Sequence, residues 1–247
     1  MEISKYIDYT LLKPSSTERD IIELCNTAIE NRFYSVCISS CYVSLAKQFL
    51  ADSDVKVCTV VGFPLGSMST EAKVYEAEKA IEDGADEIDM VINLGYLKSR
   101  NHVSVLKDIT DVKLAIGKTP LKVILEISEL NKNEIIKACE ICLDAKADFI
   151  KTSTGFSKSG ATLTAVKIIK KTIRNKAKIK ASGGIADFDT AIKYIDAGAD
   201  RIGTSKIIKN KTSNRQIINT KIYKEYIETV SNMNPSSTNA QSKKVKN

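Results

Sequence analysis

Short apolar runs alternate with amphipathic helical patterns along most of the chain, and this alternation limits the possible folds more than any other feature. The runs are rich in β-branched residues, as strands covered on both faces tend to be. Eight such runs occur, at 6–12, 33–39, 55–61, 86–92, 121–127, 148–153, 178–182 and 200–205. Seven helical patterns separate them, so the sequence predicts a TIM (β/α)₈ barrel.

The main alternative is an open, doubly wound parallel sheet, which usually carries a glycine fingerprint after its first strand. No G-x-G-x-x-G motif follows the run 6–12. The length of 247 residues suits one barrel, and no second domain is expected. We therefore predict a single barrel domain over 1–231, with a final helix that begins near Asn214. The segment 232–247 is polar and poor in apolar residues, which predicts a disordered C-terminal tail.

Charge and hydropathy restrict the classes of partner. The formal net charge is +7, but Lys243, Lys244 and Lys246 of the predicted tail contribute part of it. Acidic residues are interspersed elsewhere, which argues against a nucleic-acid or membrane partner and is compatible with a small anionic substrate. No apolar run reaches the roughly 18 residues of a membrane helix. The start, MEISKYIDYT, has no signal-peptide core, so we expect a cytoplasmic protein.

The cysteines and the histidine do not form a recognisable metal site. Six cysteines occur, and in a chain of this size without a secretion signal they are expected to stay reduced. Cys139 and Cys142 form a C-x-x-C motif, but the helical pattern around them places both on one apolar face, as in a core. The single histidine, His102, lies in a polar connection. We therefore predict no metal site and no cofactor.

Reading the ends of the predicted strands in turn gives three charged residues, Asp89, Lys151 and Lys180. Barrel enzymes carry their working residues at the C-terminal ends of the strands, so we expect these side chains to meet at one mouth. Two lysines on neighbouring strands oppose each other's protonation, which favours one free amine, as a Schiff-base nucleophile requires. Asp89 would pair with the remaining ammonium and pass protons. A single lysine would more often be a solvated strand end, whereas the group of three favours chemistry.

Loops that contain glycine follow the last three predicted strands, with the sequences STGF, SGGI and IGTS. Backbone N–H groups without Cβ bulk can hold a phosphate, and barrels often do so after strands seven and eight. Glycine is also routine in ordinary turns between strands and helices, so each loop alone is weak evidence. Three such loops beside a lysine pair predict a phosphate pocket.

Several segments resemble those of the deoxyribose-phosphate aldolase family. They are IDYTLLKP, VCTVVGFPLG, GADEIDMVIN, FIKTSTGF with the later GAT, and IKASGGI, and the resemblance extends from about residue 6 to 206. It implies a barrel that cleaves 2-deoxy-D-ribose 5-phosphate reversibly to acetaldehyde and D-glyceraldehyde 3-phosphate, in deoxyribonucleoside catabolism. It also implies a lysine Schiff base, with neither a metal nor an organic cofactor.

The resemblance assigns roles to individual positions. It implies that Lys151 forms the Schiff base, that Lys180 favours the neutral form of its amine, and that Asp89 is the proton-relay acid. The implied substrate-binding residues are Asp8, Thr10, Cys37 and Thr152 in the pocket, and Gly155, Gly183, Gly184, Gly203 and Ser205 in the phosphate loops. The implied partner is a small phosphorylated sugar, and the expected assembly is a homodimer or a homotetramer.

The chain departs from the family pattern at a few positions. Tyr9 stands where members often have histidine, and Ala186 follows SGGI where arginine is usual. Lys206 follows the last loop where a small residue is expected. We predict that Lys206 supplies the charge that an arginine at position 186 would give. In the alternative, Lys206 begins a solvated helix and backbone N–H groups alone hold the phosphate.

Two other functional classes share part of this pattern. A barrel isomerase or synthase for another phosphorylated metabolite would have the glycine loops but would not need the lysine pair. A binding barrel without catalysis would keep the fold and the phosphate pocket. The presence of both the lysine pair and Asp89 favours the aldolase.

Overall fold

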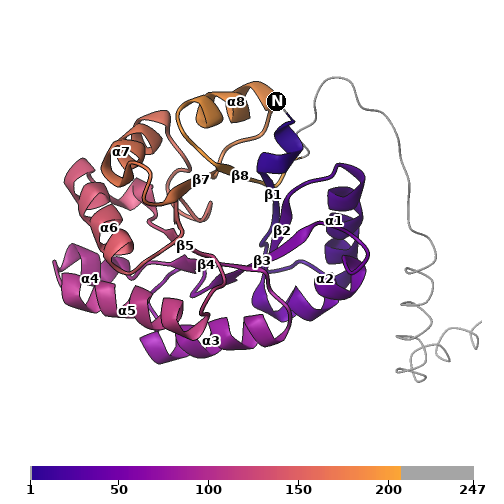
Figure 1. The fold of residues 1–247 in the computed structure, drawn as a ribbon, viewed down its shortest axis with the longest axis horizontal. Helices are drawn as coiled ribbons and strands as arrows, with labels where there is room; N and C mark the ends of the chain where they lie inside the picture. Colours follow the sequence, from indigo (N-terminus) through magenta and orange to yellow (C-terminus); the bar gives the residue numbers. More distant parts are fainter. Residues whose placement is uncertain (1, 207–247) are drawn as a thin grey trace, which may run out of the picture. The chain divides into compact units, whose positions relative to one another are not determined.

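The computed structural model describes residues 2–206, which form a closed barrel of eight parallel strands in the order β1 to β8 (Figure 1). The strands are β1 (Ile7–Leu11), β2 (Ser35–Ile38), β3 (Lys56–Val61), β4 (Glu87–Val91), β5 (Leu121–Ile124), β6 (Phe149–Lys151), β7 (Lys178–Ser182) and β8 (Arg201–Thr204). Each strand pairs with the next in sequence, and β8 pairs with β1 to close the barrel. The predicted (β/α)₈ barrel is confirmed.

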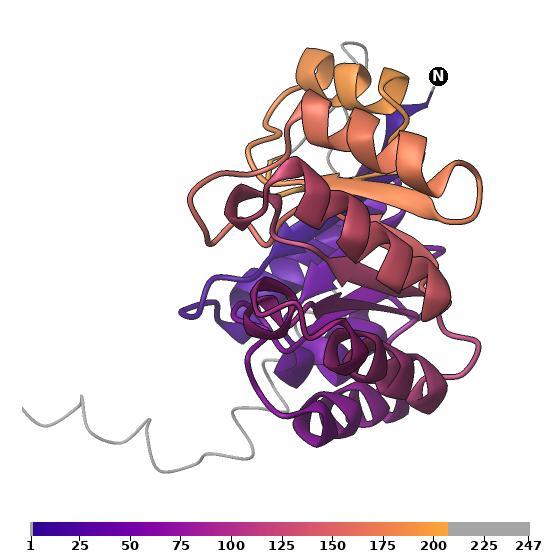
Figure 2. The ribbon, with the colours of Figure 1, turned by 90° about the vertical axis from the view of Figure 1, so that its left-hand side faces the viewer.

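Helices cover the outside of the barrel, and at least one lies in each connection between successive strands (Figures 1 and 2). They are α1 (Glu18–Glu30), α2 (Val43–Phe49), α3 (Thr70–Glu82), α4 (Leu94–Lys98), α5 (His102–Ala115), α6 (Lys132–Asp144), α7 (Leu163–Ile173) and α8 (Phe188–Asp196). Short 3₁₀ turns are η1 (Ile3–Tyr6), η2 (Ser40–Tyr42) and η3 (Ile127–Glu129). The connection between β4 and β5 holds two helices, and His102, expected in a polar connection, begins the second of them.

Local sequence signals explain where several helices begin and end. Thr17, the N-cap residue of α1, accepts a hydrogen bond from the backbone N–H of Asp20, whose carboxylate accepts one from the Thr17 N–H. This reciprocal capping box satisfies two donors that the first turn of α1 would otherwise leave free. Gly84, with a φ of +102°, follows α3 and supplies the left-handed conformation that often ends a helix.

The observed boundaries differ from the predicted ones at β5. The run 121–127 does not form one strand, because β5 ends at Ile124 and η3 begins at Ile127. The intervening Glu126 has a positive φ, which interrupts an extended strand. The predicted helix that begins near Asn214 and the predicted tail 232–247 lie outside the described residues. Within 2–206, no helix is long and apolar enough to cross a bilayer.

Side chains on the strands alternate between the helices and the barrel interior, and the two sides differ in chemistry. Along β4, Glu87 and Asp89 bond to residues on other strands of the barrel and therefore face its interior, whereas Ile88 and Met90 alternate with them. All four of these residues are at most 4% exposed. The layer between strands and helices is an ordinary apolar core, which also holds Cys139 and Cys142 as buried free thiols on α6, as predicted. The barrel interior is charged.

Candidate active site

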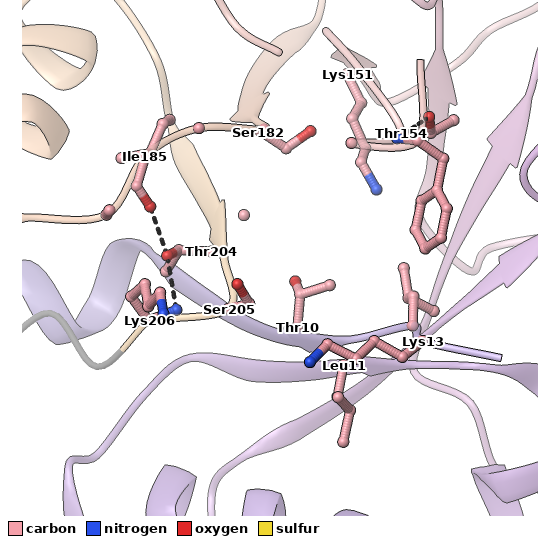
Figure 3. Close-up of a pocket in the computed structure, with 17 residues that line it drawn as sticks. Thr10, Leu11, Lys13, Lys151, Thr154, Ser182, Ile185, Thr204, Ser205 and Lys206 are labelled. Carbon is pink, nitrogen blue, oxygen red and sulfur yellow. Dashed lines mark hydrogen bonds between the residues drawn. The ribbon is translucent and has the colours of Figure 1, made fainter. Parts of the chain in front are cut away.

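Lys151 is the last residue of β6, and its side chain points into a cavity at the C-terminal mouth of the barrel (Figure 3). The cavity has a volume of about 370 Å³, and loops that follow β1, β6, β7 and β8 form its walls. Lys151 is 2% exposed, so its amine reaches the cavity from a nearly buried position. The predicted site residues that line the cavity are Thr10, Lys151, Gly155, Gly183, Gly184, Gly203, Ser205 and Lys206.

Asp89 joins the two predicted lysines. Its Oδ2 atom accepts a hydrogen bond from Lys151 Nζ over 2.7 Å and another from Lys180 Nζ over 2.8 Å. The structure therefore brings the three predicted catalytic residues together. Asp89 and Lys180 lie in the middle of β4 and β7, however, and not at the strand ends where we expected them. Both are fully buried in the barrel interior, whereas Lys151 at the end of β6 lines the cavity.

A third buried lysine completes the surroundings of Asp89, and the sequence interpretation missed it. Lys122 on β5 is fully buried, and its Nζ lies 2.8 Å from Asp89 Oδ1 and 2.7 Å from Glu87 Oε2. It also lies 3.2 Å from the Sγ atom of Cys58. The signal was present in the sequence, because Lys122 interrupts the apolar run LKVILEI just as Lys151 interrupts ADFIK.

Further ion pairs extend this arrangement across the barrel. Lys180 Nζ lies 2.6 Å from Asp8 Oδ2, and Arg201 Nη1 lies 2.8 Å from Asp8 Oδ1. Arg201 also approaches Glu87 Oε2 at 3.4 Å and stacks over the Tyr34 ring. Buried charges need such partners, because removing an ion from water is costly. We call this group the interior network, and its members are Asp8, Glu87, Asp89, Lys122, Lys151, Lys180 and Arg201.

The network fixes the charge of several of its members. Burial favours a neutral Asp89, but the neighbouring Lys122, Lys151 and Lys180 outweigh it and hold the pKa of Asp89 well below its usual range. Against the same effect of burial, Lys180 and Arg201 lower the pKa of Asp8. In return Asp8 and Asp89 raise the pKa of Lys180, although burial opposes this, and Asp89 does the same for Lys122. At neutral pH both aspartates are thus ionised and both of these lysines are protonated.

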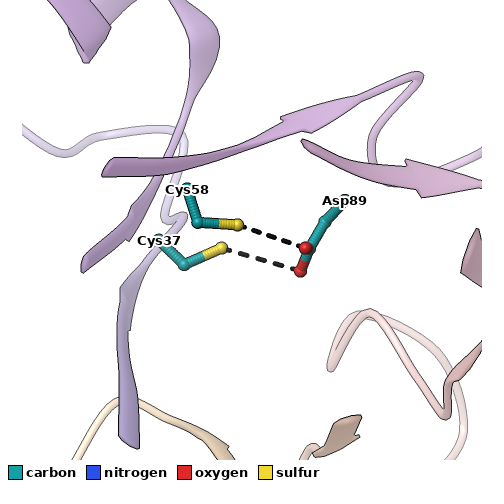
Figure 4. Close-up of side chains that lie close together, drawn as sticks. All are labelled: Cys37, Cys58 and Asp89. Atoms are coloured by element: carbon teal, nitrogen blue, oxygen red, sulfur yellow. Dashed lines mark hydrogen bonds between the residues drawn. The ribbon is translucent and has the colours of Figure 1, made fainter. Parts of the chain in front are cut away.

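Two thiols lie close to the carboxylate of Asp89 (Figure 4). Cys37 Sγ is 3.9 Å from Oδ2, and Cys58 Sγ is 3.1 Å from Oδ1. Burial raises the pKa of Cys58. The Cys58 thiol, and after it the Lys180 ammonium, lower the pKa of Cys37 to about 7. The three side chains are close enough to share a cation, but both oxygens of Asp89 already accept hydrogen bonds from lysines.

Three residues expected to line the pocket lie behind it. Asp8 and Cys37 are fully buried in the barrel interior and do not line the cavity. Thr152 is also fully buried, because its hydroxyl is used to join β6 to β7. This hydroxyl donates to the Ser182 carbonyl and accepts from the Ser182 N–H, each over 3.1 Å. Thr152 is therefore a structural link and does not reach the cavity.

Two of the predicted glycines are required by close packing. A Cβ atom on Gly183 would lie 2.7 Å from the Cα of Gly160, and Gly183 has a φ of +89°. The loops after β6 and β7 thus approach each other through glycine alone. A Cβ atom on Gly203 would lie 3.1 Å from Lys180 Cε and 2.9 Å from Ser182 Cβ. Gly203 therefore leaves space for the Lys180 stem as well as forming part of the cavity wall.

Two lysines lie at the rim of the cavity, near Thr10 and Ser205 (Figure 3). Lys206 was predicted, and its backbone N–H donates to Thr204 Oγ1 over 3.0 Å. Lys13, which follows β1, was missed, although the motif TLLKP places it just after a strand end. Ala186 lines the same cavity as Lys206, so two of the three departures from the family pattern share one space.

Comparison with protein families and curated proteins gives consistent matches. Residues 3–206 match the profile of the DeoC/LacD family aldolases. The deoxyribose-phosphate aldolase of Mycoplasma capricolum is 51% identical over 205 residues, which are 83% of this chain and 92% of the relative. That of Finegoldia magna is 54% identical over 209 residues, which are 85% of this chain and 98% of the relative.

Solved structures show the same similarity. The aldolase QR15 matches with a TM-score of 0.81 and 46% identity, covering 83% of this chain and 92% of that one. A deoxyribose-phosphate aldolase from Aeropyrum pernix, whose structure is described as a unique tetramer, matches with a TM-score of 0.76 and 34% identity. This second match covers 83% of this chain and 86% of that one.

Proposed function

Because the chain belongs to the DeoC/LacD aldolase family, we propose that it is a deoxyribose-phosphate aldolase in which Lys151 forms the Schiff base. It cleaves 2-deoxy-D-ribose 5-phosphate reversibly to acetaldehyde and D-glyceraldehyde 3-phosphate. The observation that supports the role of Lys151 is its position, since it lies at the floor of the cavity and shares one oxygen of Asp89 with a second lysine.

The charge balance of the interior network supports a neutral Lys151 amine. The network contains three carboxylates and four basic side chains, so its formal charges cancel when one base has lost its proton. Lys122 and Lys180 have raised pKa values and keep their protons. Lys151 is the basic member that faces the cavity, and only its neutral amine can attack a carbonyl.

The proposed reaction then follows from the position of this amine. Lys151 Nζ attacks the C1 aldehyde of the open-chain sugar phosphate, and loss of water gives an iminium. The cation draws electrons from the C2–C3 bond once the C3 hydroxyl has lost its proton. Glyceraldehyde 3-phosphate leaves, the resulting enamine takes a proton at C2, and hydrolysis releases acetaldehyde and restores the lysine.

Asp89 and Lys180 support this reaction from below the cavity. The iminium forms beside Asp89 Oδ2 in place of the neutral amine, so the carboxylate stabilises the positive charge as it forms. We assign the proton transfers at O3 and C2 to a relay of Lys180, Asp89 and a bound water. Acid–base assistance of this kind typically contributes about 10²–10⁴-fold to a rate.

The glycine loops after β6, β7 and β8 are the proposed phosphate site, with Lys206 as its cation. Lys13 lines the same cavity and is a second source of positive charge. We further propose a cytoplasmic enzyme that forms a homodimer or homotetramer and has no nucleic-acid or membrane partner. The described tetramer of the Aeropyrum pernix relative supports the assembly.

Reductive trapping tests the proposed chemistry directly. The protein is incubated with acetaldehyde and borohydride, and its mass and modified residue are determined by mass spectrometry. A two-carbon adduct on Lys151, together with release of acetaldehyde from deoxyribose 5-phosphate, is the expected result. A folded protein that gives neither would be an isomerase, a synthase or a binding barrel instead.

A further inference from the structure

Glu126 has a backbone conformation that is rare for residues other than glycine, and it lies just beyond the end of β5. Its φ is +56° and its ψ is +64°. On either side of it, Leu125 N–H donates to the Lys151 carbonyl and Ile127 N–H donates to the Thr152 carbonyl, each over 3.0 Å. The two donors are two residues apart in this segment, whereas their acceptors are adjacent residues, as in a β-bulge. Bulges beside active sites often redirect a side chain.

The redirected carboxyl group is buried under the loop that follows β6. Glu126 is 3% exposed, and its Oε2 atom accepts hydrogen bonds from both the N–H and the hydroxyl of Thr154, the former over 3.2 Å. Its Oε1 atom is buried without a hydrogen-bond partner. Among residues 2–206, no basic side chain forms an ion pair with it. Burial raises the pKa of this carboxyl, and a strained, buried acid without an ion-pair partner needs a reason other than stability.

Thr154 transmits the position of this carboxyl to the cavity. Its hydroxyl donates to Glu126 and accepts from the Phe156 N–H over 3.0 Å. Both ends of the turn 154–156 are therefore linked to the Glu126 carboxyl group. Thr154 bonds to it directly, and Phe156 is linked to it through the Thr154 hydroxyl. All three residues of the turn line the cavity, and Gly155 between them has a φ of +88°. Glu126 itself does not line the cavity.

We propose that Glu126 is the positioning residue for the turn 154–156 and thereby determines how tightly the phosphate end of the substrate is held. This inference rests on the proposed function, because it places the sugar phosphate in the cavity beside Lys151. Glu126 acts through Thr154 and contacts neither the substrate nor the reacting atoms.

Glu129 provides a matched control within the same turn. It is the last residue of η3, and its carboxylate accepts from Ser157 Oγ over 2.7 Å and from Lys158 Nζ over 2.9 Å. It therefore holds the same loop as Glu126, but at residues beyond those that line the cavity. Its partner Lys158 is 75% exposed in its side chain, and exposed ion pairs contribute little.

The test compares phosphorylated and unphosphorylated deoxyribose as substrates for Glu126→Leu, Glu126→Gln and Glu129→Gln. For Glu126→Leu we expect KM for deoxyribose 5-phosphate to rise about tenfold or more, with kcat changed much less, because uniform binding is lost. Cleavage of deoxyribose itself should change little. Glutamine keeps an oxygen that accepts from Thr154, so Glu126→Gln should recover most of the affinity. Glu129→Gln should behave as the wild type.

A second variant removes the hydrogen bond between the Thr154 hydroxyl and Glu126 by changing Thr154. Thr154→Val removes the hydroxyl at nearly constant volume and should raise the same KM, and the double variant Glu126→Leu/Thr154→Val should be no worse than the more impaired single variant. Should Glu126→Leu not fold, Thr154→Val and Glu126→Gln decide alone. An unchanged KM in folded Thr154→Val, or an equal loss with both substrates, would overturn the inference. All these variants should still form the acetaldehyde adduct, whereas a wild type that forms none would refute the proposed function instead.

Discussion

Lys151 and Lys180 are direct partners in the register of β6 and β7, and both donate to the same oxygen of Asp89. Two ammonium groups at this distance from one atom repel each other strongly inside a protein. Lys180 has a second carboxylate, Asp8, at 2.6 Å, which Lys151 does not have. Lys180 is thus held by two carboxylates and Lys151 by one, and this asymmetry is the basis of the first predictions.

Lys151→Ala should abolish both turnover and adduct formation while the fold is kept. Lys151→Arg should fail as well, because a guanidinium stays protonated and cannot attack a carbonyl. Activity is measured by the release of acetaldehyde, and the fold by circular dichroism. Wild-type turnover in either variant would exclude Lys151 as the nucleophile.

Lys180→Leu should lower activity severely at neutral pH and let part of it return as the pH rises. The substitution removes a positive charge beside Lys151, so the free amine forms only at higher pH. The measurement is the rate of adduct formation with acetaldehyde from pH 6 to 10, which is independent of phosphate binding. A profile with the wild-type midpoint would show that Lys180 does not control the charge of Lys151.

Lys122→Met should have a similar effect although Lys122 does not line the cavity. With Lys122 removed, three carboxylates face three bases when Lys151 is protonated, so the network no longer favours its neutral form. Removal of one buried partner also costs about 3–5 kcal/mol of stability. Lys73→Met is the matched control, because Lys73 is equally buried and pairs with Asp108 at 2.6 Å outside the barrel interior. Lys73→Met should lower stability without moving the midpoint of the rate–pH profile. If the midpoint is the same in Lys122→Met and Lys73→Met, the proposed charge balance of the interior network is wrong.

Stability should fall as the pH falls below about 4, the usual value for an aspartate. The pKa values of Asp8 and Asp89 are lower in the folded protein than in the unfolded chain, so the unfolded chain takes up protons first. The stabilisation is complete above the unfolded pKa and is lost as the pH falls toward the folded values. Urea unfolding between pH 7 and 3 measures this slope, which should be shallower in Asp8→Asn. An equal slope in that variant would assign the acid sensitivity to other carboxylates.

Lys206→Ser should raise KM for deoxyribose 5-phosphate about tenfold to a hundredfold with little change in kcat, if a hydrogen bond to the dianion is lost. Adding Ala186→Arg should restore part of the affinity. Lys13→Ser is the informative comparison, since both lysines line the cavity. If KM rises only in Lys13→Ser, Lys13 and not Lys206 binds the phosphate. If KM rises in neither variant, backbone N–H groups alone bind the phosphate.

The sequence predicted the barrel and the centre of its site because both depend on short-range patterns. A β-branched run identifies a strand, and a charge within such a run identifies Asp89, Lys151 and Lys180. The prediction placed Asp89 and Lys180 at the ends of their strands, and this was wrong, because they lie in the middle. The sequence pattern cannot separate the two positions, since a residue in the middle of a strand can face the barrel interior just as one at its end can. Lys122 carried the same signal and was passed over.

Other features could not be predicted from local patterns. The hydroxyl of Thr152 is used by the backbone of β7, which only the paired strands reveal. The positive φ of Glu126 likewise arises from its neighbours' bonds to β6 and has no signature in the run LKVILEI. The conformations of such residues depend on hydrogen bonds to residues that are distant in the chain. Secondary-structure propensity, which depends on local sequence, carries no information about these bonds.

The ion pair between Asp8 and Arg201 joins the first strand to the last, across 193 positions of the chain. A ribosome must therefore synthesise β8 before this carboxylate can find its guanidinium, and until then the seam between β1 and β8 stays open to water. Contacts of such long range form late and slowly. A nascent chain that stops short of residue 201 would lack β8, and Lys180 and Asp8 would face an open edge of the barrel. Closing the seam is therefore also the step that takes these charges out of water.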